Sequence, residues 1–159
     1  MTELNELDFK GFVTTAANEV FDTMLSMELE SVPGEAPAIT GSRIVGSVSF
    51  AGDVMGNVHI HVSQAFARLI TAAMLGMELD EVEDDEEVHD VIGELSNMVS
   101  GDLKSRLCDE GLPCQLSIPS TTSGSDFRIE SMGWSRFERY AFRCQDHLAV
   151  VEVSIKPGS

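Results

Sequence analysis

The chain has 159 residues, about the size of one domain, and its 43% hydrophobic and 23% charged content is typical of a globular protein with a buried core. The formal net charge of −17 disfavours binding to nucleic acid and to anionic membrane surfaces. We therefore expect one domain over residues 1–159 that binds neither. The acidity suits a partner with a basic face, and it equally suits a salty cytoplasm.

The N-terminus and the cysteines indicate the compartment. The opening residues, MTELNELDFK, are acidic and interrupted by polar side chains, unlike a secretory signal. No apolar run approaches the roughly 20 residues that span a bilayer. The cysteines are odd in number and lack a C-x-x-C pair, which indicates reduced thiols at Cys108, Cys114 and Cys144. We expect a cytoplasmic protein.

The first third of the chain predicts a helix followed by a β-hairpin. Apolar residues recur at steps of three and four over 3–29, which is typical of an amphipathic helix, and Pro and Gly within 31–37 end it. The runs 42–50 and 57–62 alternate apolar and other residues on either side of a Gly-Asp turn, which predicts two paired strands. The glycines of this region fit turns, bulges or close backbone contacts: Gly46, Gly52 and Gly56.

Two more helices and several strands are expected after the hairpin. The second helix covers 63–76, with Ser63 as its N-cap and Gly76 at its C-terminal end. Its predicted buried stripe consists of Phe66, Leu69, Ile70, Ala73 and Met74. The third helix covers about 87–110 and is ended by Gly111 and Pro113. Strand-like runs follow at 114–120, 135–145 and 147–156, the last two forming a hairpin that turns at Gln145 and Asp146.

These elements follow one another without regular βαβ alternation or internal repeats. They predict an α+β fold in which a largely antiparallel sheet packs with an N-terminal helix and two central helices. The acidic segment from Asp80 to Asp90 is interpreted as a solvated linker that runs into a helix N-terminus, where negative charge is favourable. Its spacing does not match a calcium-binding EF-hand loop.

The third helix carries a polar stripe within DVIGELSNMVSGDL, residues 90–103. At 100° per residue and with Asp90 as zero, Glu94 lies near 40°, Asn97 near −20° and Gly101 near 20°. The apolar residues fall on the opposite side of the helix and form its core face: Val91, Ile92, Leu95, Met98 and Val99. We call Asp90, Glu94, Asn97 and Gly101 the polar stripe.

Two chemical uses suit the polar stripe. A carboxylate can pair with a lysine of a partner or substrate. A carboxamide both donates and accepts hydrogen bonds, so it can orient a water molecule without acting as a base, which is what hydrolysis of a phosphoryl group needs. The alternative is a solvated helix face with no role, and the spacing alone leaves that alternative open.

Histidines provide the other candidates for chemistry. His59 and His61 are two apart on a predicted strand, so they share a face that could bind a metal, but no third ligand stands out. A position on the polar surface of the sheet is the simpler expectation. His89 points about 100° away from the stripe, which disfavours a role as general base. No Gly-x-Ser-x-Gly motif supports Ser/His/Asp catalysis.

The helix resembles the signature helix of the CheC/CheX/FliY phosphatases of bacterial chemotaxis. Their motif has Asp or Ser, three residues, Glu, two residues and Asn, which Asp90, Glu94 and Asn97 match. The family pattern adds a proline after about 22 residues, and here Pro119 follows after 21. Flanking segments are also similar: GFVTTAANEVFDTML, GSVSFAGDVMGNVHIHVS and ARLITAAMLG. The signature occurs once, which is most like CheX, whereas CheC-like chains tend to carry it twice.

The resemblance implies that the protein hydrolyses the aspartyl phosphate of a response-regulator receiver domain of CheY type. It implies that Asn97 positions the attacking water and that Glu94 pairs with the receiver's active-site lysine. Asp90 and Gly101 would have supporting or docking roles. No cofactor of its own is implied, because the receiver would bring Mg²⁺. The resemblance also implies a homodimer formed through sheet edges. The alternative function is a receiver-binding or flagellar-switch-like module without catalysis.

Overall fold

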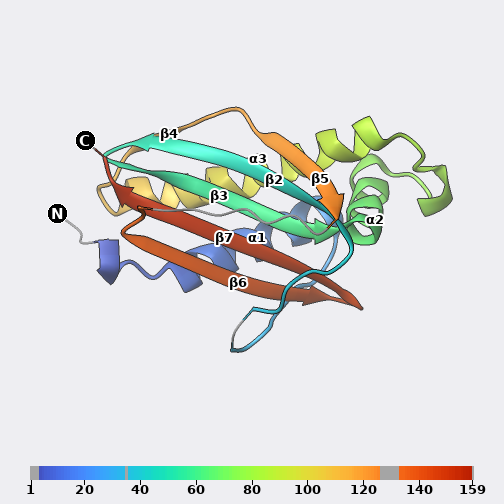
Figure 1. The fold of residues 1–159 in the computed structure, drawn as a ribbon, viewed down its shortest axis with the longest axis horizontal. Helices are drawn as coiled ribbons and strands as arrows, with labels where there is room; N and C mark the ends of the chain where they lie inside the picture. The colour runs from blue at the N-terminus through green and yellow to red at the C-terminus, as the bar shows by residue number, and fades with distance from the viewer. Residues whose placement is uncertain (1–3, 35, 126–132, 159) are drawn as a thin grey trace.

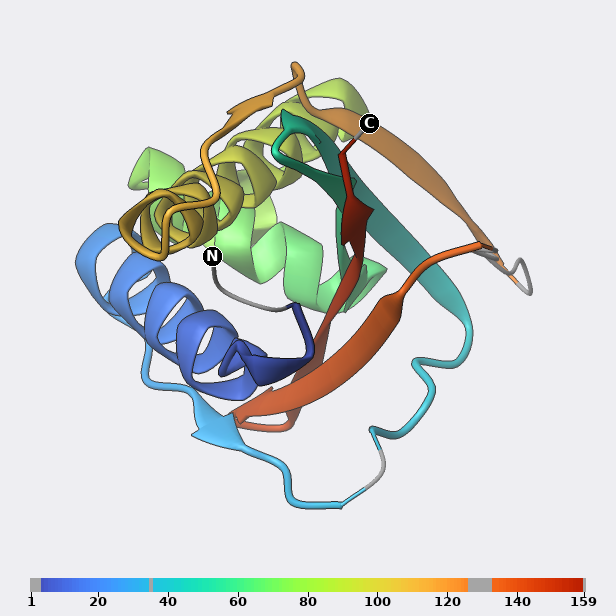
Figure 2. The same ribbon diagram turned by 90° about the vertical axis from the view of Figure 1, so that its left-hand side faces the viewer.

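The computed structural model describes residues 4–34, 36–125 and 133–158, which form one sheet covered on one face by helices (Figures 1 and 2). The helical elements in this part of the chain are η1 (Leu4–Glu6), α1 (Phe9–Leu25), α2 (Gln64–Leu75), η2 (Leu79–Glu81) and α3 (Asp85–Asp109). The strands are β1 (Glu30–Ser31), β2 (Ser42–Gly52), β3 (Val54–Ser63), β4 (Cys114–Leu116), β5 (Ser120–Ser125), β6 (Arg136–Cys144) and β7 (His147–Pro157).

The predicted α+β class with an antiparallel sheet is confirmed. The sheet built from the described residues has seven strands in the order β1-β6-β7-β3-β2-β4, and β5 also pairs with β2. Every pairing is antiparallel. Both predicted hairpins form: β2 with β3, and β6 with β7 across the turn at Gln145 and Asp146.

The apolar residues of one sheet face meet the helices. Figure 2 shows α1, α2 and α3 gathered on the same side of the sheet, while the connection from β1 to β2 loops out on the other side. Alternate residues of β3, Val58, Ile60 and Val62, are 0–1% exposed and join the same hydrophobic core as Phe66 of α2 and Leu95 of α3. Burial of this apolar surface is the main stabilising contribution to the fold.

The second helix is bounded as the sequence predicts. The Ser63 side chain accepts a hydrogen bond from the Phe66 backbone N–H at 3.1 Å, and Gly76 ends the helix with a φ of 66°. The predicted buried stripe needs correction at Ala73, which is exposed; Ala67, Thr71 and Ala72 are buried instead. The helix is enclosed on more than one side, so its buried surface is wider than one stripe.

The first and third helices differ from their predicted bounds. The expected helix over 3–29 consists of a short 3-10 turn and α1, because Asp8 caps the Gly11 N–H and Ser26 ends the helix in the left-handed conformation with a φ of 53°. Helix α3 begins earlier than expected, because Asp84 accepts a hydrogen bond from Glu86 N–H at 2.9 Å. The carboxylates in its first turn suit the positive end of the helix dipole.

The run 114–120 is two strands rather than one. β4 pairs with the end of β2 at Leu116↔Phe50, and β5 pairs with the beginning of β2 from Ser47↔Ser120 onward. Residues 117–119 leave the ladder between them and form what we call the 117–119 bulge. Sequence patterns missed β5, STTSGS, because it has no apolar alternation to mark it as a strand.

Close approach of α3 to β2 sets the position of the third helix. A Cβ placed on Gly46 would lie 2.0 Å from Ser96 Oγ and 3.2 Å from the Ile92 carbonyl oxygen. Ser96 is fully buried, and its hydroxyl donates to that same carbonyl at 2.8 Å. Of the three sequence interpretations for Gly46, the close backbone contact is therefore the correct one.

Substitution of Gly46 tests this contact. Gly46→Ala should lower the free energy of unfolding by about 1–3 kcal/mol, because the new methyl group overlaps Ser96 and the helix must move. Denaturant unfolding measures the change. Adding Ser96→Gly to Gly46→Ala should recover part of the loss, since the two positions are in contact.

The matched control is Gly101→Ala on the exposed face of the same helix. A Cβ at Gly101 meets no heavy atom within 4 Å, so alanine should leave the free energy of unfolding unchanged or raise it by about 1 kcal/mol. Equal losses for Gly46→Ala and Gly101→Ala would contradict the packing argument.

Candidate functional site

The polar stripe lies on the solvent side of α3. Asp90 and Glu94 are exposed, and Asn97 and Gly101 are partly exposed. On the opposite side of the helix Ile92, Leu95 and Val99 are 0–2% exposed, and Val91 is 6% exposed. The structure therefore brings all four predicted site residues to one accessible face, as the helical period predicts. Met98 alone of the predicted core face is only partly buried.

The side chains of the stripe are free to meet a partner. Within the residues that the structure describes, no hydrogen bond or ion pair engages the side chains of Asp90, Glu94 or Asn97. The space above Gly101 is open to at least 4 Å from where its Cβ would be. The helix thus presents a carboxylate and an amide next to an unobstructed turn of backbone.

One flank of the stripe is covered by the segment that leads from the 117–119 bulge into β5. A Cβ at Gly93 would lie 3.8 Å from Cβ and Cγ of Pro119 and 3.7 Å from Cγ2 of Thr121. The hydroxyl of Thr121 lies 2.7 Å from Nδ1 of His89. His89 therefore has a neighbour in β5, and it faces away from the stripe, as its position on the helical wheel predicts. Pro119 lies beside the stripe helix despite its shift by one position.

This arrangement can position a water molecule and bind a cation of a partner. The Asn97 amide can accept a hydrogen bond from water at Oδ1 and donate from Nδ2. The Glu94 carboxylate can form charge-assisted hydrogen bonds with a lysine. Neither group needs another residue of this chain for these interactions.

His59 and His61 are buried, which corrects the expectation of a polar sheet surface. They lie on the sheet face away from the helices and are 9% and 4% exposed. Ser47 Oγ lies 2.8 Å from Nδ1 of His59, and Nε2 of His61 is paired with Glu152. Among the described residues, no group of three or more His, Cys, Asp or Glu side chains could hold a metal ion.

Glu152 connects His61 to the loop that covers this face. Arg139 Nε lies 3.2 Å from Glu152 Oε2, and Arg139 Nη1 donates to the Ala36 carbonyl at 2.7 Å. Burial by itself would raise the pKa of Glu152, but the hydrogen bond with His61 and the charges of His61 and Arg139 outweigh it, and the pKa lies below 4.5. A single carboxylate inside the apolar run HLAVVEVSIK is the sequence signal that could have indicated this network.

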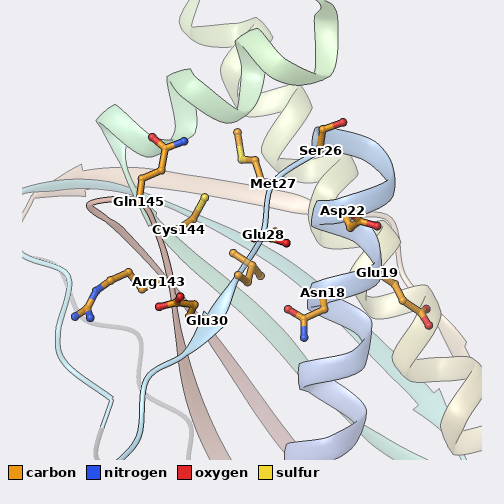
Figure 3. Close-up of a pocket in the computed structure, with 11 residues that line it drawn as sticks. Asn18, Glu19, Asp22, Ser26, Met27, Glu28, Glu30, Arg143, Cys144 and Gln145 are labelled. Carbon is orange, nitrogen blue, oxygen red and sulfur yellow. The ribbon is translucent and has the colours of Figure 1, made fainter.

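A cavity of about 1160 Å³ lies away from the stripe, between the end of α1, β1 and the turn from β6 to β7 (Figure 3). Acidic side chains dominate its polar lining: Glu19, Asp22, Glu28 and Glu30, with Arg143 from β6. Asn18 and Glu19 also line it, but as consecutive residues they point about 100° apart on the helix. The pair of Glu and Asn on one face of α3 is therefore not repeated at this cavity.

The cysteines lie outside the stripe and are free. Cys108 is exposed, while Cys114 and Cys144 are buried. Burial raises the pKa of both buried thiols, so they stay protonated and weakly nucleophilic. Among the described residues, no helix combines the length and apolar character that a membrane span requires.

Comparison with known families tests the family resemblance of this helix. The family model described as chemotaxis phosphatase CheX matches residues 44–143, which include most of β2, all of β3, α2 and α3, and most of β6. The chain belongs to the CheX family. The resemblance inferred from the signature helix is thus confirmed, and the polar stripe lies inside the matched span.

Individual relatives agree with this assignment. CheX of Thermotoga maritima, named CheY-P phosphatase, is 31% identical over 91 residues, which are 57% of this chain and 57% of that protein. The match thus spans little more than half of that relative. The crystal structure of CheX from Vibrio vulnificus has a TM-score of 0.80 at 26% identity and covers 94% of this chain and 97% of that one. A CheX-CheY-BeF₃-Mg²⁺ complex from Borrelia burgdorferi has a TM-score of 0.79 at 22% identity and covers 95% and 99%, which shows a shared fold.

The buried histidine network predicts that this CheX-family protein loses stability in acid. Burial lowers the pKa of His59 below 6.5, so the unfolded chain takes up this proton before the folded protein does. Acidification through about pH 6.5 should therefore lower the free energy of unfolding. The lowered pKa of Glu152 extends the loss as the pH falls below 4.5, because the folded protein keeps the carboxylate ionised.

Denaturant unfolding at about pH 7.5, about pH 6 and about pH 5 measures this dependence. His59→Gln should reduce the change between the first and the last pH, whatever its effect on stability at neutral pH. An identical slope in the variant would show that His59 does not contribute to it.

Proposed function

We propose that the protein hydrolyses the aspartyl phosphate of a phosphorylated receiver domain of CheY type. The observation that carries the proposal is the pair of Glu94 and Asn97 side by side on the accessible face of α3, in a CheX-family chain. The T. maritima relative named CheY-P phosphatase and the B. burgdorferi complex of CheX with CheY support this substrate class.

Asn97 is the residue to which we assign water positioning. Its amide would hold a water molecule in line with the bond between phosphorus and the aspartate oxygen. The water oxygen bonds to phosphorus as that bond breaks, and aspartate leaves as a carboxylate. The attacking oxygen keeps one proton of the water, and the other proton passes to another oxygen of the phosphate product. An amide suits this task because it orients the water without competing as a nucleophile.

Glu94 would dock the receiver. Its carboxylate would pair with the receiver's active-site lysine, which places Asn97, about one turn along the helix, next to the phosphoryl group. The Mg²⁺ that neutralises charge on the phosphoryl oxygens would come with the receiver substrate. Asp90 and Gly101 would support docking, Asp90 through its charge and Gly101 through the space it leaves.

Homodimerisation and cytoplasmic location stay predictions. In the described residues the sheet ends at β1 and β6 on one side and at β4 and β5 on the other. The two residue pairs of β1 cover one end of β6. An edge of this kind is compatible with pairing between two copies.

Loss of the Asn97 amide should separate catalysis from binding. Asn97→Ala should reduce the acceleration of receiver dephosphorylation by about 100-fold or more, equivalent to about 2.7 kcal/mol of barrier, because the water loses its orientation. The measurement is the decay of phosphate on a CheY receiver with and without the protein. Binding to the receiver should persist, which isothermal titration calorimetry checks.

The matched control is Asn18→Ala, which removes an exposed amide from α1 and should leave the decay unchanged. No acceleration by the wild-type protein with several receivers from its own genome, despite binding, would replace the phosphatase with the alternative binding module. Full activity of Asn97→Ala would refute the assigned role.

Loss of the Glu94 charge should act on receiver affinity. Glu94→Gln keeps the size of the side chain but removes its charge, so the KM for phosphorylated receiver should rise by about tenfold. Glu86→Gln removes a charge from the first turn of the same helix and should change KM much less. Steady-state decay rates at a series of receiver concentrations give KM and kcat separately. Equal effects of the two substitutions would reduce Glu94 to a contribution to net charge.

A further inference from the structure

The 117–119 bulge carries the most exposed large apolar side chain among the residues that the structure describes. Ile118 is 88% exposed, whereas Met24, Leu75, Leu79 and Phe137 are 44–49% exposed. A single apolar side chain on a surface is ordinary by itself. Its meaning depends on how firmly the main chain holds it and on what lies next to it.

The backbone around Ile118 is fixed on both sides. Ser117 N–H donates to the Ser49 carbonyl at 2.8 Å, and Ser49 N–H donates to Ser117 Oγ at 3.0 Å. The Ser117 hydroxyl in turn donates to the Ile118 carbonyl at 3.0 Å. Pairing with β2 resumes at Ser120. The Ile118 side chain therefore projects into solvent from an ordered backbone. A partner that binds to it loses little conformational entropy of the 117–119 bulge.

The 117–119 bulge lies next to the polar stripe. Pro119, the next residue, lies beside Gly93 of α3, because a Cβ built on Gly93 would be 3.8 Å from Cβ and Cγ of Pro119. Gly93 lies about 40° around the helix from Asn97, on the side that faces β5. In Figure 2 the connection from β4 to β5 projects beside α3 at the end of the sheet. A partner large enough to cover Asn97 and the adjacent turn of α3 therefore contacts Ile118.

A second copy of the chain is a poor binding partner for the 117–119 bulge. Adding a strand to the sheet needs a continuous row of free backbone groups. The 117–119 bulge interrupts that row, and Pro119 has no N–H to donate. An anionic membrane surface is disfavoured by the net charge of −17.

We propose that the phosphorylated receiver domain binds to the surface formed by α3 and the 117–119 bulge, and that Ile118 is the apolar anchor of this interface, the side chain that the receiver buries. This inference rests on the proposed function. The polar stripe supplies the charged and catalytic contacts, and Ile118 supplies the buried apolar contact at their edge. Interfaces of this kind concentrate their affinity in a few large side chains that become fully desolvated.

The test compares Ile118→Ser with wild type in the receiver dephosphorylation assay. KM should rise by about tenfold, the loss expected from leaving one isoleucine unburied, while kcat stays within about twofold. Ile118→Leu should restore most of the affinity. The control is Phe137→Ser, which changes a half-exposed apolar residue on β6, with β7 and β3 between it and β2, and should leave KM unchanged.

The thermal unfolding temperature of Ile118→Ser should match wild type, because the side chain is 88% exposed. If wild type binds no receiver and accelerates no decay, both the function and the anchor fail. If wild type is active and Ile118→Ser keeps the same KM, the anchor alone is refuted. A change of sedimentation coefficient in Ile118→Ser without receiver would assign the residue to self-association and also refute it.

Discussion

Which residues α3 exposes to solvent is set by the close packing of its opposite face against strand β2. Only a glycine at position 46 leaves room for Ser96, and this contact fixes the rotation of the helix about its own axis. A shift by one residue would turn the helix by about 100° and direct Glu94 toward its neighbours. Near the C-terminal end of α3, Arg106 forms ion pairs with Asp102 of the same helix and with Glu19 of α1, which link the two helices. For the proposed role of Asn97, a rigid helix is a better base than a loop, because a water-positioning amide has to be held in a narrow range of orientations.

The two faces of the sheet have different chemistry. The face toward the helices is filled by aliphatic and aromatic side chains, while the other face buries His61 and Glu152. The partly exposed Arg139 joins Glu152 to the connection from β1 to β2. Buried polar groups are tolerated there because each ionisable group has an oppositely charged or hydrogen-bonding neighbour. This network lies across the sheet from α3, so its effect is on stability rather than on the polar stripe.

The sequence predicted those parts that follow a helical or alternating period. Helix α2 with its caps, both hairpins and the polar stripe could be found because apolar residues recur regularly and Ser63 and Gly76 mark helix ends. Strand β5 was missed because its small polar residues carry no such pattern, and the long helix over 3–29 was wrong because Asp8 and Ser26 interrupt an apolar period that continues beyond them. The burial of His59 and His61 was also missed, because the partner of His61 is Glu152, which lies about 90 residues away in the chain and is brought beside it only by the pairing of β3 with β7. The single carboxylate in the apolar run of β7 marks an unusual position, but it does not say which strand lies next to it.

The hydrogen bonds that hold the 117–119 bulge use the main chain and the Ser117 hydroxyl, and none involves the Ile118 side chain. The identity of the residue at the tip is therefore decoupled from folding and from the geometry of Asn97. If Ile118 anchors a receiver as proposed, a lineage with several receivers in one cell could exchange this one side chain and alter partner choice, while the proposed catalytic residues of α3 stay unchanged. Selectivity and catalysis would then evolve at separate positions of the same surface.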